Sequence, residues 1–424
     1  MVILLFAVFL GSLMLGLPVA FAIALGCLAY LIPSGIPLII IPQRMFGGID
    51  SFVLLAVPGF ILAGNLMNGG GITKRIVGFS NALVGWIRGG LGLANVAASM
   101  IFAGISGTAI ADTASIGAVL IPAMKEEGYE ADFACAVTAS SSTVGPIIPP
   151  SLPMIVAGTM TGLSVSRLFV AGAVPGVLLG VSMMLVSYAI SVKRGHPKGE
   201  RAGLGTIVKS GVGAFWAILM PLIILFGIVG GVFTPTEASV VAVLYALFVG
   251  TVVYRMLTIR SIIGILKETA VMTASIMVLV GFANLFAWIL TSERIPQMIA
   301  DAILGITTNR FLVLMLVNLL LLFVGTFMET IAALLIMFPV LLRLVTTVGV
   351  DPIHFAIICV LNLIIGLTTP PVGVCLFVAA SIGKVSLGRL AMAVLPFLAV
   401  SLAVLMLVTY VPEITLFLPN LLFD

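Results

Sequence analysis

The chain carries very little charge for its length. Only 8% of its 424 residues are Asp, Glu, Lys or Arg, whereas about 25% is usual in soluble proteins. A soluble protein of this size needs a charged surface, and this sequence has too few charged residues to form one. The composition therefore excludes a soluble globular protein and a disordered chain. A net charge of only +4 gives no basis for nucleic-acid binding.

Residues that support metal or covalent chemistry are also scarce. Cys27, Cys135, Cys359 and Cys375 lie singly in apolar runs without metal-ligand spacing, and there are only two histidines. The sequence contains no phosphate-binding loop of the GxxxxGK[ST] type, so we do not expect ATP to drive this chain directly. Without a nucleophile–base pair or a di-metal motif, we predict that the protein is not an enzyme.

Hydrophobic residues make up 62% of the sequence and form long unbroken runs. About 20 apolar residues cross a bilayer as a helix, and several runs reach that length. We predict membrane spans near 3–31, 54–70, 169–191, 213–233, 237–254, 269–290 and 389–411. The first run lacks a positively charged start, so we expect it to be a retained helix rather than a signal peptide.

One polar stretch divides the chain. The segment 193–211 contains five of the 19 basic residues and lies between two apolar spans. The positive-inside rule places such a segment in the cytoplasm. We therefore predict a cytoplasmic basic linker over 193–211, which separates a first half, 1–192, from a second half, 212–424.

The two halves contain matching motifs. Gly145–Pro150 in the first half corresponds to Gly366–Pro371 in the second, and 366 − 145 = 221. Upstream, Gly107–Thr108 corresponds to Gly325–Thr326, and 325 − 107 = 218. A third pair follows downstream in the same order, which indicates a duplication. Charge and span parity place the second copy in the membrane in the opposite sense.

Each half also contains apolar segments that are too short or too broken to be simple spans. We predict a hairpin over about 91–124 and a broken helix over about 133–162 in the first half. In the second half we predict a hairpin over about 311–342 and a broken helix over about 353–381. The predicted fold is an all-α polytopic membrane protein with an inverted-topology repeat, two re-entrant hairpins and two broken transmembrane helices. This arrangement is typical of secondary transporters.

The two predicted breaks are rich in oxygen atoms. Ser140–Pro146 combines hydroxyl side chains with glycine and proline, and Leu367–Val372 repeats this combination. Unwound backbone at membrane depth must face protein or water, and its carbonyl oxygens suit a small hard cation such as Na⁺. The half-helix that follows each break presents a positive N-terminus to an anion. A hairpin tip that meets a break in each half predicts two cation sites with the substrate between them.

These patterns single out candidate side chains. Candidate contacts for the substrate are Ser141, Ser142, Thr143, Pro150 and Thr369, and candidate cation ligands at the hairpin tips are Thr108 and Thr326. Asp112 and Glu329 follow the two tips, and acidic residues at membrane depth are functional candidates. They could cap the returning helix, ligate a cation or carry a proton, and the alternative for all these residues is that they only kink and pack helices.

The motifs resemble a known family. Ser106–Gly117 continued by Ser140–Ser151, and Val57–Gly64 followed by Gly71–Arg75, resemble the large membrane subunit of tripartite ATP-independent periplasmic (TRAP) transporters. The resemblance covers essentially the whole chain. It implies a Na⁺-driven elevator in which the hairpins and broken helices form a mobile domain that slides against a fixed scaffold.

The resemblance also implies ligands, partners and location. One Na⁺ site would use Ser106, Ser142 and Gly145, and the other would use Gly325, Thr368, Thr369 and Val372, partly through backbone carbonyls. A small four-helix membrane subunit would extend the scaffold in the bacterial inner membrane. A periplasmic binding protein would deliver an organic acid, such as a C4-dicarboxylate, a sialic acid or another sugar acid.

Two other functions stay open at this point. The chain could be a stand-alone ion-coupled organic-anion symporter that needs no binding protein. It could also be a non-transporting membrane scaffold subunit, although the duplicated tips and breaks would then have no explanation.

Overall fold

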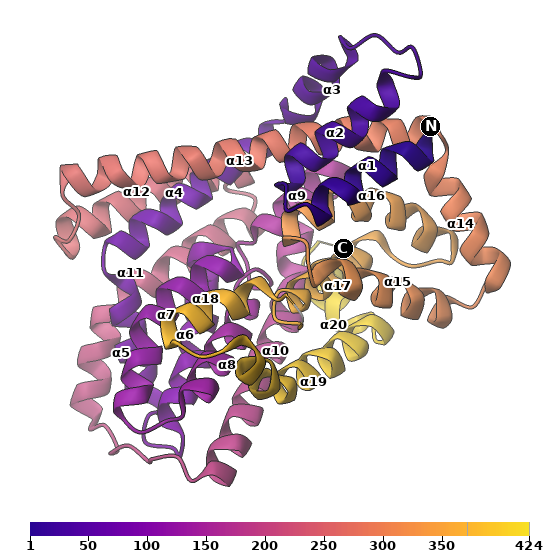
Figure 1. Ribbon diagram of the computed structural model, residues 1–424. Coiled ribbons are helices and arrows are strands. Elements are labelled where there is room, and N and C mark those ends of the chain that lie inside the picture. Colours follow the sequence, from indigo (N-terminus) through magenta and orange to yellow (C-terminus); the bar gives the residue numbers. More distant parts are fainter. Residues whose placement is uncertain (371, 424) are drawn as a thin grey trace.

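The protein is helical throughout the part that the computed structural model describes (Figure 1). The structure describes residues 1–370 and 372–423, without the side chains at 106, 296, 299, 300, 303, 304 and 306, and it has no β-strand in these ranges. Its first half contains α1 (Val2–Met14), α2 (Val19–Leu31), α3 (Ile40–Ile49), η1 (Phe52–Leu55), α4 (Ala56–Gly69), α5 (Ile72–Val84), α6 (Gly90–Ser106), α7 (Ala109–Glu126), α8 (Ala131–Ser141), η2 (Ser142–Val144), α9 (Leu152–Thr161) and α10 (Val165–Arg194). Its second half contains α11 (Leu204–Val229), α12 (Pro235–Phe248), η3 (Val249–Val253), α13 (Ile259–Ser292), α14 (Ile295–Ile306), α15 (Arg310–Gly325), α16 (Thr330–Thr347), α17 (Pro352–Gly366), α18 (Val374–Gly383), α19 (Leu387–Tyr410) and α20 (Glu413–Phe423).

Seven helical segments within the described residues are long and apolar enough to cross a membrane. Six of them coincide with predicted spans, so the prediction of an all-helical, multi-span membrane protein is confirmed. The seventh is α16, which the sequence analysis treated as one arm of a hairpin.

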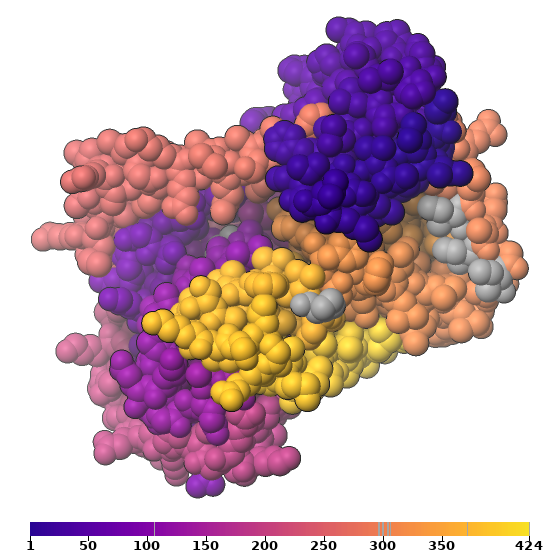
Figure 2. Space-filling model, viewed as in Figure 1, coloured from indigo at the N-terminus to yellow at the C-terminus, as the bar shows by residue number. Residues whose placement is uncertain are grey.

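The prediction of a single helix over 3–31 is wrong. Gly16 has a φ of +81°, which ends α1, and Pro18 caps α2, so two short helices pack against each other instead. A single run of apolar residues cannot distinguish one long helix from two short ones that are joined by a Gly–Pro turn. Figure 2 shows the resulting N-terminal lobe on the surface, and α2 and α3 pack on α13.

The two halves have the same order of elements. The hairpin helices α7 and α16 both have 18 residues, and they begin at Ala109 and Thr330, with 330 − 109 = 221. The helices α8 and α17 begin at 131 and 352, again with 352 − 131 = 221. The structure thus contains the same offset as the motifs, while the opposite sense of the halves in the membrane stays a prediction.

Both predicted broken helices are interrupted in the structure. A break, here called break 1 (residues 142–151), separates α8 from α9, and break 2 (residues 367–373) separates α17 from α18. Pro371, within break 2, lies outside the described residues. Helices α6 and α7 meet at a turn, called tip 1 (residues 107–108), and α15 and α16 meet at tip 2 (residues 326–329). Re-entry of these hairpins into the membrane stays a prediction.

The half-helix that follows each break packs against the opposite half of the chain. Helix α18 packs on α7 and α8 of the first half, and α9 packs on α16 and α17 of the second half (Figure 1). Amides fix each hairpin to its own broken helix: Asn95 Nδ2 donates to Thr138 Oγ1 over 2.7 Å, and Asn362 Nδ2 donates to Asn318 Oδ1 over 2.7 Å. These buried bonds join the hairpins and broken helices into one body.

Candidate functional site

Tip 1 rests on break 1. Gly107 has a φ of +65°, and a Cβ added there would lie 3.3 Å from Leu152 Cγ and 3.6 Å from the Pro150 carbonyl oxygen. The left-handed backbone and the short distance to the start of α9 both favour glycine at the tip. Tip 1 therefore meets the N-terminus of the half-helix α9, as the sequence pattern predicts.

A carboxylate lies against the backbone of break 1. Asp112, in the first turn of α7, is fully buried, and a Cβ added to Gly145 would lie only 2.0 Å from Asp112 Oδ2. Only glycine leaves room for the carboxylate at this position. The carboxyl group of Asp112 thus reaches the unwound stretch that the sequence assigns to a cation.

Tip 2 meets break 2 in the same way. A Cβ added to Gly366 would lie 2.5 Å from the carbonyl carbon of Gly325, so the two backbones touch. The amide of Gly373 donates to the carbonyl oxygen of Thr326 over 3.3 Å. Each half therefore brings a hairpin tip onto the break of its own broken helix.

Most of the predicted ligand hydroxyls at the breaks donate to helix carbonyls. Ser142 Oγ donates to the Thr138 carbonyl over 2.8 Å, and Thr326 Oγ1 donates to the Phe323 carbonyl over 2.7 Å. Thr368 Oγ1 and Thr369 Oγ1 both donate to the Ile365 carbonyl, over 3.0 and 2.9 Å. When a hydroxyl donates its proton in this way, its oxygen still has free lone pairs. That oxygen can therefore ligate a cation.

Two of the predicted substrate contacts lie in packed interfaces. Ser141 is fully buried, accepts a hydrogen bond from Ser99 over 2.8 Å and donates to Asn95. Thr143 is also buried and donates to the Ser140 carbonyl over 2.6 Å. Neither side chain lines the two cavities described below.

The remaining predicted residues lie near the tips and breaks. Pro150 and Gly107 line one small space beside α4, and Val372 is half-buried in break 2. Ser106 ends α6, and its side chain lies outside the described part of the structure.

A cavity of about 270 Å³, here called the central cavity, separates the two tips. Its lining comes from both hairpins and both breaks: Gly107, Thr108, Ala109, Ile110, Pro146, Pro153, Glu329, Thr330, Ile331 and Leu367. The first turns of α7 and α16 both line it, and the Glu329 carboxylate caps the N-terminus of α16 there.

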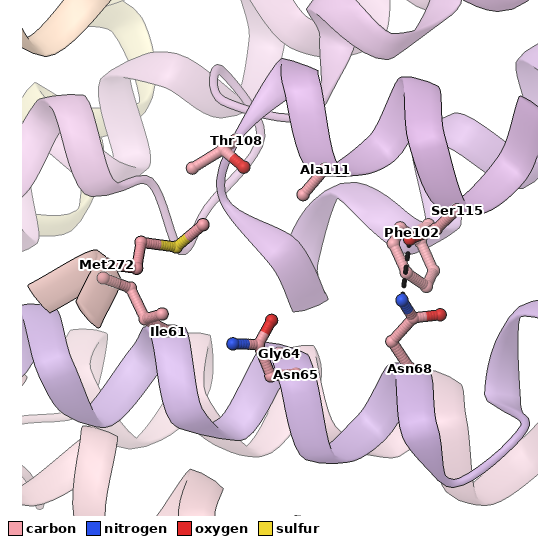
Figure 3. Close-up of a pocket in the computed structure, with 9 residues that line it drawn as sticks. All are labelled: Ile61, Gly64, Asn65, Asn68, Phe102, Thr108, Ala111, Ser115 and Met272. Atoms are coloured by element: carbon pink, nitrogen blue, oxygen red, sulfur yellow. Dashed lines mark hydrogen bonds between the residues drawn. The ribbon is translucent and has the colours of Figure 1, made fainter. Parts of the chain in front are cut away.

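A second cavity of about 360 Å³, here called the side chamber, lies between α4, the first hairpin and α13 (Figure 3). Its lining is Ile61, Gly64, Asn65, Asn68, Phe102, Thr108, Ala111, Ser115 and Met272. Asn68 Nδ2 donates to Ser115 Oγ over 2.8 Å across the chamber wall, and Thr108 lines both cavities.

Glu329 is the N-cap residue of α16. Its carboxylate caps α16 and accepts hydrogen bonds from the amides of Ile331 and Ala332, over 2.9 and 3.1 Å. Capping was one of the roles considered for this residue. The N-cap of α7 is Thr108, which has no charge, so the two tips differ in charge at equivalent positions.

Several residues that line the cavities were not predicted from the sequence. Asn65 and Asn68 lie three residues apart in an apolar run, a spacing that places both on one face of α4. Amides at membrane depth were a usable signal, because polar side chains there are costly. Thr330 follows Glu329 directly, but nothing in the sequence shows that this residue lines a cavity.

Comparison with known proteins agrees with this architecture. The family model of the tripartite ATP-independent periplasmic transporter, DctM component, matches residues 5–414. The chain is 45% identical over 413 residues to the sialic acid TRAP transporter large permease protein SiaM of Vibrio cholerae, with 97% of each chain covered. It is 41% identical to the C4-dicarboxylate TRAP transporter large permease protein DctM of Pseudomonas aeruginosa, with 89% of this chain and 88% of that protein covered.

Two further matches extend the comparison. The chain is 43% identical to the isethionate TRAP transporter permease protein DctMQ of Oleidesulfovibrio alaskensis, covering 97% of this chain but 65% of that protein. The solved structure of the Alcanivorax borkumensis YdaH transporter has a TM-score of 0.60 at 17% identity and covers 87% of this chain and 86% of that one. This likeness shows a membrane-transporter fold.

The family match and the close relatives agree with the resemblance that the motifs indicated. The relatives are permeases, so the protein is a multi-pass membrane transport protein and not an enzyme. The chain belongs to the DctM-component family of large permeases of tripartite ATP-independent periplasmic transporters.

Proposed function

We propose that this chain is the Na⁺-coupled transport subunit that carries an organic-acid anion across the bacterial inner membrane. A periplasmic binding protein delivers the anion, and a small four-helix membrane subunit supports the scaffold. The observation that carries the proposal is the convergence of both tips and both breaks on the central cavity. The named substrates of the relatives above, which are sialic acid, a C4-dicarboxylate and isethionate, are all organic anions.

The acidic residues at the tips supply a reason for coupling. Asp112 lies against break 1, and Glu329 lines the central cavity, so an anion that enters the cavity meets the carboxylate of Glu329 and is repelled by it. Cations at the two tip–break contacts offset that repulsion. The proposed Na⁺ ligands are the oxygens of Ser142, Gly145 and Thr108 in the first half, together with Ser106.

The second proposed Na⁺ site repeats this set in the other half. Its ligands are oxygens of Gly325, Thr326, Thr368, Thr369 and Val372. Gly325 and Gly366, the residues just before tip 2 and break 2, approach so closely that a Cβ added to Gly366 would lie 2.6 Å from the Gly325 carbonyl oxygen. The anion then binds between two Na⁺ sites, one in each half of the chain.

The isethionate relative gives information about the small membrane subunit. This chain covers only 65% of that protein, which therefore has a further segment in the same polypeptide. We propose that this chain works together with a small membrane subunit. The stand-alone symporter and the non-transporting scaffold are the two outcomes that a transport assay must separate from the proposal.

Reconstituted uptake tests the proposal. The chain is co-purified with its small subunit, placed in proteoliposomes, and given an inward Na⁺ or K⁺ gradient with a panel of labelled organic acids. The expected result is uptake that needs both Na⁺ and the binding protein. Uptake with Na⁺ alone identifies a stand-alone symporter. Equal uptake in Na⁺ and K⁺ gradients contradicts the cation sites, and transport by a complex that lacks this chain identifies a scaffold.

A further inference from the structure

The linker after α10 folds back onto the corner between α5 and α6. The Gly89 amide donates to the Pro197 carbonyl oxygen over 3.0 Å. The neighbouring residues, Arg88 and Lys198, form an isolated antiparallel bridge. Residues directly opposite each other in such a bridge have their side chains close together on one face, and two like charges there repel each other. The contact is therefore unfavourable in charge unless an anion lies beside it.

A third cation and an aromatic ring join this pair. The Arg201 guanidinium lies over the Trp86 ring, 5.4 Å from its centre, and Trp86 is 39% exposed. Tryptophan is common at the interface between membrane and water. We call Arg88, Lys198 and Arg201 the cationic trio. All three are exposed, and none of them forms an ion pair with a described residue.

The acidic residues of this region leave the trio positive. Glu130 and Asp132 already contact Arg194, over 3.6 and 3.2 Å. Glu200 is the one acidic residue among residues 195–203, and it is exposed. Three cations against one glutamate give this corner a net positive charge, which favours an anionic partner.

An exposed apolar stripe begins three residues after Arg201. It consists of Leu204, Val208, Val212 and Phe215 of α11, all more than half exposed. Their spacing of four, four and three residues places them on one face of α11, which packs along α5 (Figure 1). The stripe is about 16 Å long, close to half of the roughly 30 Å hydrocarbon core of a bilayer. The trio and the stripe together therefore have the dimensions of one phospholipid in one leaflet.

We propose that the cationic trio and the stripe bind one anionic phospholipid of the phosphatidylglycerol type. Its phosphate lies between the three cations, and an acyl chain lies along the stripe on α11. The positive-inside rule places this linker on the cytoplasmic side, where anionic lipids attract cations next to a span. A free phosphate would leave the apolar stripe uncovered. The bound lipid fixes the linker between the two halves of the chain to the membrane surface.

Quenching of Trp86 fluorescence by brominated lipids tests the site directly. The full chain carries Trp216→Phe and Trp288→Phe, which leave Trp86 as its one tryptophan. It is placed in phosphatidylcholine vesicles with increasing fractions of brominated phosphatidylglycerol or brominated phosphatidylcholine. We expect half-maximal quenching at a fraction at least about fivefold lower for phosphatidylglycerol.

Three outcomes of this measurement overturn the inference. Equal quenching by the two lipids means that the trio does not select an anionic headgroup. Absence of quenching by either lipid means that something other than lipid covers Trp86. Relief of the quenching by excess inorganic phosphate identifies a site for a free phosphate instead of a lipid.

A triple variant tests the assigned cations. Replacing all three residues of the cationic trio by glutamine should make the two brominated lipids quench Trp86 equally. The matched control removes the same charge from the next basic cluster, and it should keep the preference for phosphatidylglycerol: Arg255→Gln, Arg260→Gln and Lys267→Gln. Equal loss of the preference in both triple variants indicates attraction by net charge alone and overturns the site.

A single substitution keeps the test valid if the triple variant does not fold. Lys198 is exposed, and its bridge to Arg88 is made by the backbone, which Lys198→Gln retains. We expect Lys198→Gln to reduce the preference for phosphatidylglycerol at least about twofold. An unchanged preference in this variant overturns the assignment of the bridged pair to the headgroup.

Discussion

At the scale of single residues, the breaks combine hydroxyls with glycines for complementary reasons. The hydroxyls of Ser142, Thr368 and Thr369 donate to carbonyls of the preceding turn, so their protons are fixed and their lone pairs remain for a ligand. Gly145 and Gly366 let a carboxylate and a neighbouring backbone approach to distances that a Cβ would not allow. The result is a group of hydroxyl oxygen atoms at each break, and in the first half the Asp112 carboxyl group lies beside it.

Gly145→Ala should reduce the affinity for Na⁺. The new Cβ would lie 2.0 Å from Asp112 Oδ2, so the carboxylate must move away from break 1. We expect the Na⁺ concentration for half-maximal uptake to rise about tenfold, the effect of losing about 1.4 kcal/mol of ion binding. Gly264→Ala on α13, where a Cβ meets nothing within 4 Å, is the matched control. An unchanged Na⁺ dependence would show that Asp112 and break 1 do not bind the ion.

Thr369→Val should weaken Na⁺ binding, whereas Thr369→Ser should not. Valine keeps the shape of the side chain but removes the oxygen, while serine keeps the hydroxyl that donates to the Ile365 carbonyl. We expect the half-maximal Na⁺ concentration to rise about fivefold or more for valine and less than about twofold for serine. Equal behaviour of the two variants in Na⁺ titrations of uptake would exclude Thr369 Oγ1 as a ligand.

At the scale of helices, the ends of α8 and α10 are held together outside the apolar spans. Arg194 at the end of α10 contacts Asp132 and Glu130 over 3.2 and 3.6 Å, and His196 forms a further pair with Glu130. His196 is buried between the rings of Tyr129 and Phe133, with centroid separations of 4.6 Å to each. This cluster joins the loop after α10 to the start of the first broken helix.

Acidification should release this cluster. Partial burial alone would raise the pKa of Glu130, but the hydrogen bond to His196 and the charges of His196 and Arg194 hold that pKa below its usual value. Because the pKa of Glu130 is lower in the folded protein, charged Glu130 stabilises the folded cluster at pH values above the ordinary pKa of a glutamate. This stabilisation is lost as the pH falls through the lowered pKa.

Hydrogen exchange of the backbone amides in the loop 195–203 measures how much charged Glu130 stabilises the cluster. At pH 7 we expect Glu130→Gln to exchange about two- to fivefold faster than the native chain, because a half-exposed ion pair contributes at most about 1 kcal/mol. As the pH falls through the lowered pKa of Glu130, the difference between the two proteins should disappear. Glu200→Gln, an exposed glutamate in the same loop, is the control. A difference that persists in acid would mean that charge on Glu130 is not the cause.

The sequence predicted the elements that local chemistry defines. Gly145–Pro146, Thr369–Pro370 and Gly107 all lie where helices are interrupted in the structure, as their glycine and proline content predicts. The division at Gly16 was missed because apolar length alone does not reveal a turn. Asn65 was missed because its partner, Thr269, is 204 residues away and only tertiary packing brings them together.

At the scale of the whole molecule, α9 packs on the second half and α18 packs on the first half. Each half therefore contributes a helix to the packing of the other. The hairpins, breaks and half-helices pack into one interlocked body, and α12 and α13 each pack on α4 outside it. The hydrogen bond from Asn68 on α4 to Ser115 on α7 connects these two groups beside the side chamber (Figure 3). If transport moves the interlocked body against the outer helices, this contact must break in each cycle.

A reversible cross-link at this contact tests whether the two groups move. Asn68→Cys combined with Ser115→Cys places two thiols where the native side chains are 2.8 Å apart, and oxidation should stop uptake almost completely until a reductant restores it. Asn95→Cys with Thr138→Cys, also at a 2.7 Å contact but within the interlocked body, should transport equally when oxidised or reduced. Comparing each variant with its own reduced form removes any effect of the substitutions on substrate affinity. Undiminished uptake by the fully oxidised α4–α7 pair would mean that the first hairpin stays fixed to α4 while the substrate crosses, and that the transport movement lies elsewhere in the molecule.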